Sequence, residues 1–154
     1  MNDASLNTLI VPDHHSLRSR RTELAIRGQS GVRLHTLEQL TCRLAGGFLE
    51  PIDLDSLKMA IQTASKKNLG ELDTIKALPG FQQAVANSLR KAWNAGIDLR
   101  KEWKTSESDD ANRRLEALVT LEDEVLRLIP KRLKRPQELV DIAIQRAELC
   151  PQLF

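Results

Sequence analysis

Residues whose side chains can do chemistry gather at one junction near the start of the chain, TLIVPDHHSLRSRRTELAIRG (residues 8–28). Its apolar residues 9–11 predict a short strand buried on both faces, and Pro12 ends it. Such junctions are frequent phosphate sites, because backbone N–H groups at a helix start attract anions. This loop has neither glycine nor lysine, and GQSG (residues 28–31) follows a helix and lacks the lysine. The junction therefore does not match a GxxxxGK[ST] nucleotide loop.

A nuclease site is a second interpretation of the same junction. Pro12-Asp13 and the later Glu102-Trp103-Lys104 together spell a PD…ExK pattern. In that chemistry, carboxylates on adjacent strands share a metal ion. Here the ExK triplet lies in or just after helical sequence, about ninety residues away. We therefore expect a solvated helix end rather than a metal site.

Histidine and cysteine offer weaker sites. The adjacent His14 and His15 point in different directions on a regular backbone, although His35 lies near the end of the second predicted strand and can join them. We expect an exposed loop or a phosphate contact at these histidines. Cys42 lies on an amphipathic helix without an evident base, which is typical of a small core residue. Cys42 and Cys150 form no metal or disulfide pattern. No catalytic residue, metal or cofactor is predicted.

The basic residues are concentrated in one segment. The chain has 23 Lys and Arg against 21 Asp and Glu. Residues 14–43, however, contain six arginines against only Glu23 and Glu38. The arginines are Arg18, Arg20, Arg21, Arg27, Arg33 and Arg43. Arg18 and Arg21 are three positions apart and share a helix face. This segment is either a phosphate-binding surface or a solvated basic helix.

The elements that must position these residues follow from local patterns. Ser16 to Arg27 is predicted to be a helix that Gly28 closes, and residues 31–36 alternate like a second strand. Thr36 caps a further helix, residues 37–44. Strand-helix-strand-helix with short connections implies parallel pairing through a crossover. Ligands bind at the carboxyl ends of parallel strands, where both the loop 12–16 and the Thr36 turn lie.

Beyond Pro51 the pattern is helical. Helices are predicted from Asp53 or Asp55 to about Lys67, and over 81–95, 111–128 and about 136–149. The fold class is therefore mostly α with a small parallel β component, with residues 1–50 as a partial α/β segment and 51–154 as a helical subdomain. Two strands are too few for an independent sheet. Either the helical part covers them, or further chain completes the sheet.

The composition and the lack of a recognisable targeting signal predict a cytoplasmic protein. The first residues are polar and acidic, unlike a signal peptide. No apolar run approaches the roughly 18 residues that a membrane span needs. The sequence therefore predicts a soluble protein in a reducing compartment, without a membrane partner.

The stretch TLIVPDHHSLRSRRTELAIR, followed by GVRLHTLEQLTCRLAGGFLEPID, resembles the N-terminal region of AddB-type helicase–nuclease subunits. These are large bacterial DNA-repair proteins of the PD-(D/E)XK family, with a degenerate superfamily 1 helicase domain. Similar features are the Val-Pro step after a strand, the Leu/Arg-rich helix and the Thr-Leu-x-x-Leu helix. LPGFQQAVANSLRKAWNAGIDL also resembles their helical insert. The resemblance covers about residues 6–100.

In superfamily 1 helicases the corresponding strand ends are motifs Ia and Ib, which contact the backbone of single-stranded DNA. By this likeness Pro12, Asp13, His14, Leu17, Arg18 and Arg21 match motif Ia, and Thr36, Leu37 and Gln39 match motif Ib. The resulting nucleic-acid-binding candidates are Pro12, His14, Ser16, Arg18, Arg21, Thr36 and Gln39.

The sequence departs from the AddB-type family in the motifs that carry catalysis. No Walker A segment precedes residue 8, no Walker B or nuclease motif follows, and the family's chains are several times longer. We therefore expect a DNA-backbone-binding portion of an AddB-like helicase–nuclease, without a catalytic centre of its own and with further helicase–nuclease domains or subunits as neighbours. Its setting would be double-strand-break repair or defence against foreign DNA. The alternative is a helical protein–protein interaction module that buries the apolar stripes of residues 111–128 and 136–149 against a partner.

Overall fold

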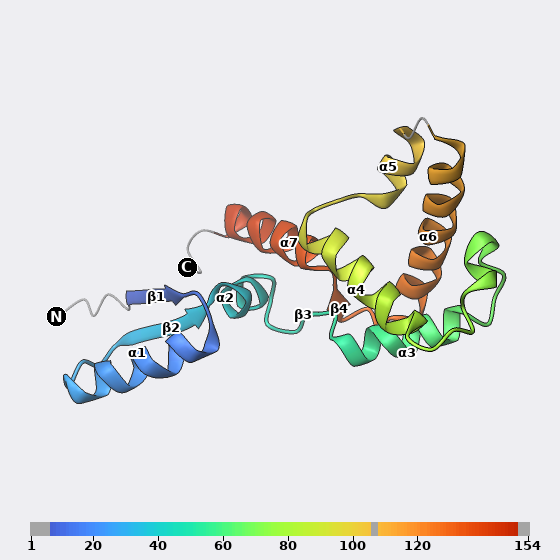
Figure 1. Cartoon of the computed structure of the whole chain (residues 1–154). Coiled ribbons are helices and arrows are strands. Elements are labelled where there is room, and N and C mark those ends of the chain that lie inside the picture. The colour runs from blue at the N-terminus through green and yellow to red at the C-terminus, as the bar shows by residue number, and fades with distance from the viewer. Residues whose placement is uncertain (1–6, 106–107, 151–154) are drawn as a thin grey trace. The chain divides into compact units, whose positions relative to one another are not determined.

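The computed structural model describes residues 7–105 and 108–150 (Figure 1). The chain divides into two compact units. Unit 1 contains Met1–Leu49 and Val140–Phe154, and unit 2 contains Glu50–Leu139. The fold is mostly α with a small parallel β component, as predicted. The sequence-based division at residue 50 assigned the segment after Val140 to the helical part, whereas here it groups with unit 1.

Unit 1 begins with the predicted strand-helix-strand-helix order. The elements are β1 (Asn7–Val11), α1 (His14–Ile26), β2 (Val32–Thr36) and α2 (Leu37–Leu44). β1 and β2 pair in parallel, with Leu9 opposite Leu34 and Val11 opposite Thr36. Such pairing needs a crossover rather than a tight turn, and α1 provides it. The predicted parallel pairing is confirmed.

The predicted start of α1 at Ser16 is wrong by two residues. Asp13, not Ser16, is the N-cap, and its side chain accepts a hydrogen bond from the backbone N–H of Ser16. Ser16 is therefore the third residue of the helix. Asp is a residue type that is common at N-caps, so local propensity agrees with the observed start. At the other end, Gly28 has a φ of +65°, as predicted for the residue that closes this helix.

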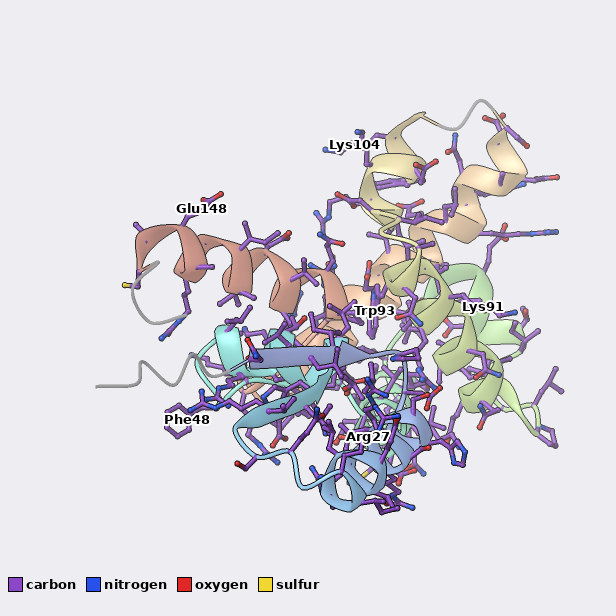
Figure 2. The ribbon with its side chains drawn as sticks, turned by 90° about the vertical axis from the view of Figure 1, so that its left-hand side faces the viewer. Arg27, Phe48, Lys91, Trp93, Lys104 and Glu148 are labelled. Atoms are coloured by element: carbon purple, nitrogen blue, oxygen red, sulfur yellow. The ribbon has the colours of Figure 1, made fainter. Side chains whose placement is uncertain are left out.

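The core of unit 1 is small. Its buried apolar side chains within the described residues are Val11, Leu17, Ala45 and Ala143. Several large apolar side chains are exposed, including Ile10 and Phe48, which is 88% exposed and projects from the ribbon (Figure 2). α1 buries only Leu17. A helix with one buried residue has most of its surface available for contacts with other molecules.

Unit 2 is a helical bundle. It contains α3 (Leu54–Ala64), the 3-10 helix η1 (Gly70–Thr74), α4 (Phe81–Asn94), α5 (Leu99–Thr105) and α6 (Asp109–Leu128). Two short strands, β3 (Glu50–Pro51) and β4 (Leu133–Lys134), pair in parallel. α7 (Pro136–Leu149) begins in unit 2. The prediction omitted η1, β3 and β4 and treated α5 only as a helix end, because each is too short for a periodic signal.

The core of unit 2 forms where α3, α4 and α6 meet (Figure 1). Leu57, Ile61, Leu89, Leu121 and Val125 are all fully buried there. These residues come from apolar positions spaced three or four apart, so each helix turns one stripe inward. The apolar stripe of α6 is therefore buried inside unit 2, where it packs against α3 and α5.

A buried carboxylate joins the helices of unit 2. Glu122 of α6 is 6% exposed and accepts a hydrogen bond from Trp93 Nε1 of α4 at 2.6 Å. Figure 2 shows Trp93 among the helices of the unit. Arg135 Nη1 lies 3.7 Å from Glu122 Oε1 and also pairs with Glu138. A buried charge is tolerated only when it is paired and hydrogen-bonded, so these contacts are needed for the packing of α4 on α6.

We expect Glu122→Ala to lower the free energy of unfolding by about 2–3 kcal/mol, because Trp93 loses its acceptor and a buried ion pair is broken. Glu122→Gln keeps an acceptor oxygen, so its loss is smaller, about 1 kcal/mol. Urea unfolding followed by tryptophan fluorescence measures both, since the two tryptophans, Trp93 and Trp103, lie in unit 2.

The matched control is Glu116→Ala on the exposed side of the same helix. A surface change of this kind costs within about 0.5 kcal/mol. If Glu122→Ala costs no more than Glu116→Ala, the buried carboxylate does not hold the bundle together.

A second prediction concerns the N-cap of α3. The hydroxyl and backbone N–H of Ser56 hydrogen-bond the Asp53 carboxylate and lower its pKa below the usual 3.8. A lowered folded-state pKa means that the stabilisation is fully present above the unfolded-state pKa and is lost as the pH falls through the folded-state value. We expect Asp53→Ala to cost about 1 kcal/mol at pH 7. The difference from wild type should shrink below about pH 4.

Asp53→Asn is the control for this cap, because asparagine caps a helix without titrating. Urea unfolding of the three proteins at pH 7 and pH 3 tests the prediction. A gap between wild type and Asp53→Ala that stays constant between these pH values would contradict it.

Candidate nucleic-acid interface

The first strand end, at Pro12, carries an exposed polar loop. Pro12, His14 and His15 are all exposed, and Ser16 is half-buried. Asp13 Oδ1 lies 2.7 Å from the backbone nitrogen of Ser16, and this hydrogen bond lowers the pKa of Asp13. The carboxylate therefore occupies the N-terminus of α1, where a phosphate would otherwise receive backbone donors.

The second strand end, at Thr36, is closed by a capping box. Thr36 Oγ1 accepts from the backbone N–H of Gln39 at 3.2 Å, and Gln39 Oε1 accepts from the backbone N–H of Thr36 at 3.1 Å. Thr36 is only 5% exposed. This reciprocal pair explains the Thr-x-x-Gln spacing on structural grounds. Phosphate binding by Thr36 or Gln39 stays a prediction.

The arginines of α1 fall into two groups. Arg20 and Arg27 both pair with Glu23, and the Arg20 hydrogen bond, with the positive charge of both arginines, holds the pKa of Glu23 low. Arg18 and Arg21 are exposed, and neither forms an ion pair with an acid within residues 7–105 and 108–150. Among the arginines of α1, Arg18 and Arg21 are therefore the two whose charge no ion pair of the described residues neutralises.

Arg21 also belongs to a concave site, which we call the basic hollow. The hollow has a volume of about 530 Å³. Its cationic and titratable lining residues are Arg21 of α1, Arg33 and His35 of β2, and Arg43 of α2. The remaining lining residues are Leu24, Ala25, Gln29, Ser30, Gly31, Val32 and Leu34. The lining contains no carboxylate, so the local field favours an anion.

The basic hollow borders the edge of β2. Four consecutive residues, 32–35, line it, although side chains along a strand alternate between faces. A hollow that touches all four must border the strand's edge, and in the described part of the chain the other edge pairs with β1. Backbone donors and acceptors of an edge strand are available to a ligand. Gly31, with a φ of +82°, makes the turn that leads into the strand.

One contact joins His35 to Arg43. Arg43 Nη1 lies 3.4 Å from His35 Nε2. The contact places the imidazole ring beside a guanidinium group, which has five N–H donors and no acceptor. The three guanidinium groups are the strong donors of the hollow, and an oxyanion accepts charge-assisted hydrogen bonds of this kind.

Of the predicted binding residues, only Arg21 lines the basic hollow. Pro12, His14, Ser16, Thr36 and Gln39 lie at the strand ends described above, and Arg18 lies on α1. Arg33, His35 and Arg43 were missed as a group. The sequence signals for them were the arginine-rich segment 14–43, which contains Arg33 and Arg43, and the alternation of Arg33 and His35 along the second strand. Their meeting with Arg21 depends on the crossover, which no local spacing shows.

The other candidate sites are not assembled. Among the described residues, no group of three or more His, Cys, Asp and Glu side chains could hold a metal ion. Glu102 lies on the helix α5, as predicted, not on a strand. Cys42 is half-buried and Cys150 exposed, and neither forms a disulfide.

Comparisons with known proteins leave the family open. No protein-family model, curated protein or solved structure gives a significant match. Within the described residues, no helix combines the length and apolar character that crossing a membrane requires.

A prediction separates the capping role of Thr36 from a ligand role. We expect Thr36→Ala to destabilise α2 by about 1 kcal/mol, because the backbone N–H of Gln39 loses its acceptor. Thr36→Ser keeps the hydroxyl and should change stability by only a few tenths of a kcal/mol. Amide hydrogen exchange at Gln39 measures the effect directly. Equal exchange rates in wild type and Thr36→Ala would rule out the capping role.

Proposed function

We propose that unit 1 binds the sugar–phosphate backbone of nucleic acid, single-stranded DNA above all, through the basic hollow and the exposed face of α1. The observation that carries this proposal is a carboxylate-free hollow in which three arginines from three different elements line one space. Arginine is suited to phosphate, because its planar guanidinium group can donate two parallel hydrogen bonds.

The electrostatics of the hollow support binding without base recognition. Backbone contacts position a nucleic acid but carry no sequence information. The lining contains no Phe, Tyr or Trp side chain, so the large stacking surface of many single-strand binders is missing from it. Leu24, Val32 and Leu34 instead offer an apolar wall for a sugar or the face of a base. We therefore expect little dependence of affinity on base sequence and a strong dependence on salt.

The bound strand would continue from the hollow along α1. Arg21 lines the hollow, and Arg18 shares its helix face three positions earlier. His14 and Pro12 are exposed at the start of the same helix. This path joins the hollow to the strand-end residues that the AddB-like resemblance suggested. That resemblance supports a setting in DNA repair or defence against foreign DNA, in the cytoplasm.

The alternative function, a helical interaction module, retains one specific observation. The α6 stripe is buried inside unit 2, but Val140 and Ile144 of α7, four positions apart, are 38% and 52% exposed. A partner helix packed on these residues would bind by apolar burial. Its affinity would not fall as the salt concentration rises, unlike that of a nucleic acid.

We expect a fluorescently labelled single-stranded oligonucleotide to bind the full chain at low salt, as measured by anisotropy. The logarithm of affinity should fall with the logarithm of salt concentration, by a slope of about 0.7 per phosphate contact. Arg21→Ala and Arg33→Ala should each weaken binding about fivefold, as expected for about 1 kcal/mol. Each should also reduce the slope by about 0.7.

Arg90→Ala is the matched control, because Arg90 is an exposed arginine on α4 of unit 2. It should leave affinity and slope unchanged. Absence of binding at low salt would refute the proposal. Equal losses in Arg33→Ala and Arg90→Ala would show general charge attraction rather than a site in the hollow.

A further inference from the structure

The charge in the basic hollow exceeds what an internal phosphate of a strand requires. Three guanidinium groups share the lining with His35 and no acid. An internal phosphodiester has one negative charge and two free oxygens. A terminal phosphomonoester has about −1.5 to −2 charges at pH 7 and three free oxygens. The terminal group matches several donors better.

The donors come from directions that suit such a group. Arg33 and His35 are two positions apart on β2, so their side chains leave the same face of the strand. Arg43 is held beside His35 by the 3.4 Å contact, and Arg21 reaches the hollow from α1. Donors from a strand, its edge and two helices surround an anion better than a linear series along one groove would.

The size of the hollow also favours a single terminal nucleotide as its ligand. Its volume of about 530 Å³ lies within the range of roughly 300–1,000 Å³ typical of pockets for one small ligand. Proteins that bind the middle of a strand instead follow several successive nucleotides along a groove. Here the strong donors are concentrated in a space for one terminal nucleotide, and the apolar wall of Leu24, Val32 and Leu34 can pack against its sugar and base.

We infer that the basic hollow takes the terminal phosphate of a nucleic-acid strand. This inference rests on the proposed function and deepens it, because unit 1 would then recognise the ends of nucleic-acid strands. The remainder of the strand then runs over Arg18 and the exposed face of α1. Because the chemistry of a 5′-phosphate and a 3′-phosphate is shared, the experiment must distinguish them.

The test uses the full chain and three internally labelled oligonucleotides of one sequence, which carry a 5′-phosphate, a 3′-phosphate or only hydroxyl ends. We expect one phosphorylated end to bind about tenfold more tightly than the hydroxyl ends in an anisotropy titration, as one or two additional charge-assisted hydrogen bonds provide. The double variant Arg33→Ala with Arg43→Ala should abolish that preference. Arg90→Ala should keep it.

A second double variant tests whether a loss of preference comes from the lost guanidinium groups or from a misfolded protein. Arg33→Lys with Arg43→Lys retains both charges but loses the guanidinium geometry. We expect it to bind hydroxyl-ended strands like wild type and to lose most of the preference for a phosphorylated end. Retention of the full preference in both double variants would overturn the inference.

The remaining outcomes separate this inference from the proposed function. Salt-dependent binding of equal strength for all three oligonucleotides overturns the terminal-phosphate inference and leaves backbone binding standing. Failure of every oligonucleotide to bind at low salt overturns both. A preference that an octaglutamate peptide removes as effectively as the phosphorylated strand also overturns the inference, because the β2 edge would then accept any acidic segment.

Discussion

The parallel pairing of β1 with β2 is the constraint on which the candidate site depends. Parallel strands cannot be joined by a tight turn, so the chain must cross over through a helix, and α1 is that helix. The register sets Leu9 opposite Leu34, and the crossover helix α1 contacts β2. Arg33 and His35 thereby come to the same space as Arg21, and α2, which follows β2 directly, adds Arg43. No local sequence spacing would bring these four residues together without the pairing of the two strands.

The helix starts in unit 1 satisfy their own donors, which leaves anion binding to side chains. Asp13 occupies the N-terminus of α1, and Thr36 and Gln39 close that of α2. These caps stabilise the helices but remove the backbone donors that a phosphate loop would use. An anion-binding surface in this unit must therefore rely on guanidinium groups and on the edge of β2. The arginine-rich composition of residues 14–43 is consistent with that requirement.

Local sequence signals predicted most helices and strands. Contacts between residues far apart in the sequence could not be predicted from such signals. Gly28, Thr36 and Pro136 mark element ends through backbone chemistry that acts within a few residues, so those ends were predictable. The start of α1 was predicted two residues too late, because the capping side chain of Asp13 was not recognised. β3 and β4, two residues each, pair only because unit 2 brings residues 50 and 133 together. The basic hollow has the same origin, since its charge comes from residues spread between positions 21 and 43.

The different treatment of charge in the two units is an independent argument for a binding role. In unit 2 many charged side chains pair across elements, as in Lys67 with Glu124, Arg100 with Asp123 and Arg132 with Glu50. Surface pairs of this kind contribute little each, but each places opposite charges side by side. The arginines of the basic hollow have no carboxylate in the lining and repel one another. Local features that work against stability are expected at functional sites, where a ligand offsets the cost. An anion in the hollow would remove this repulsion, so binding should also stabilise unit 1 against unfolding.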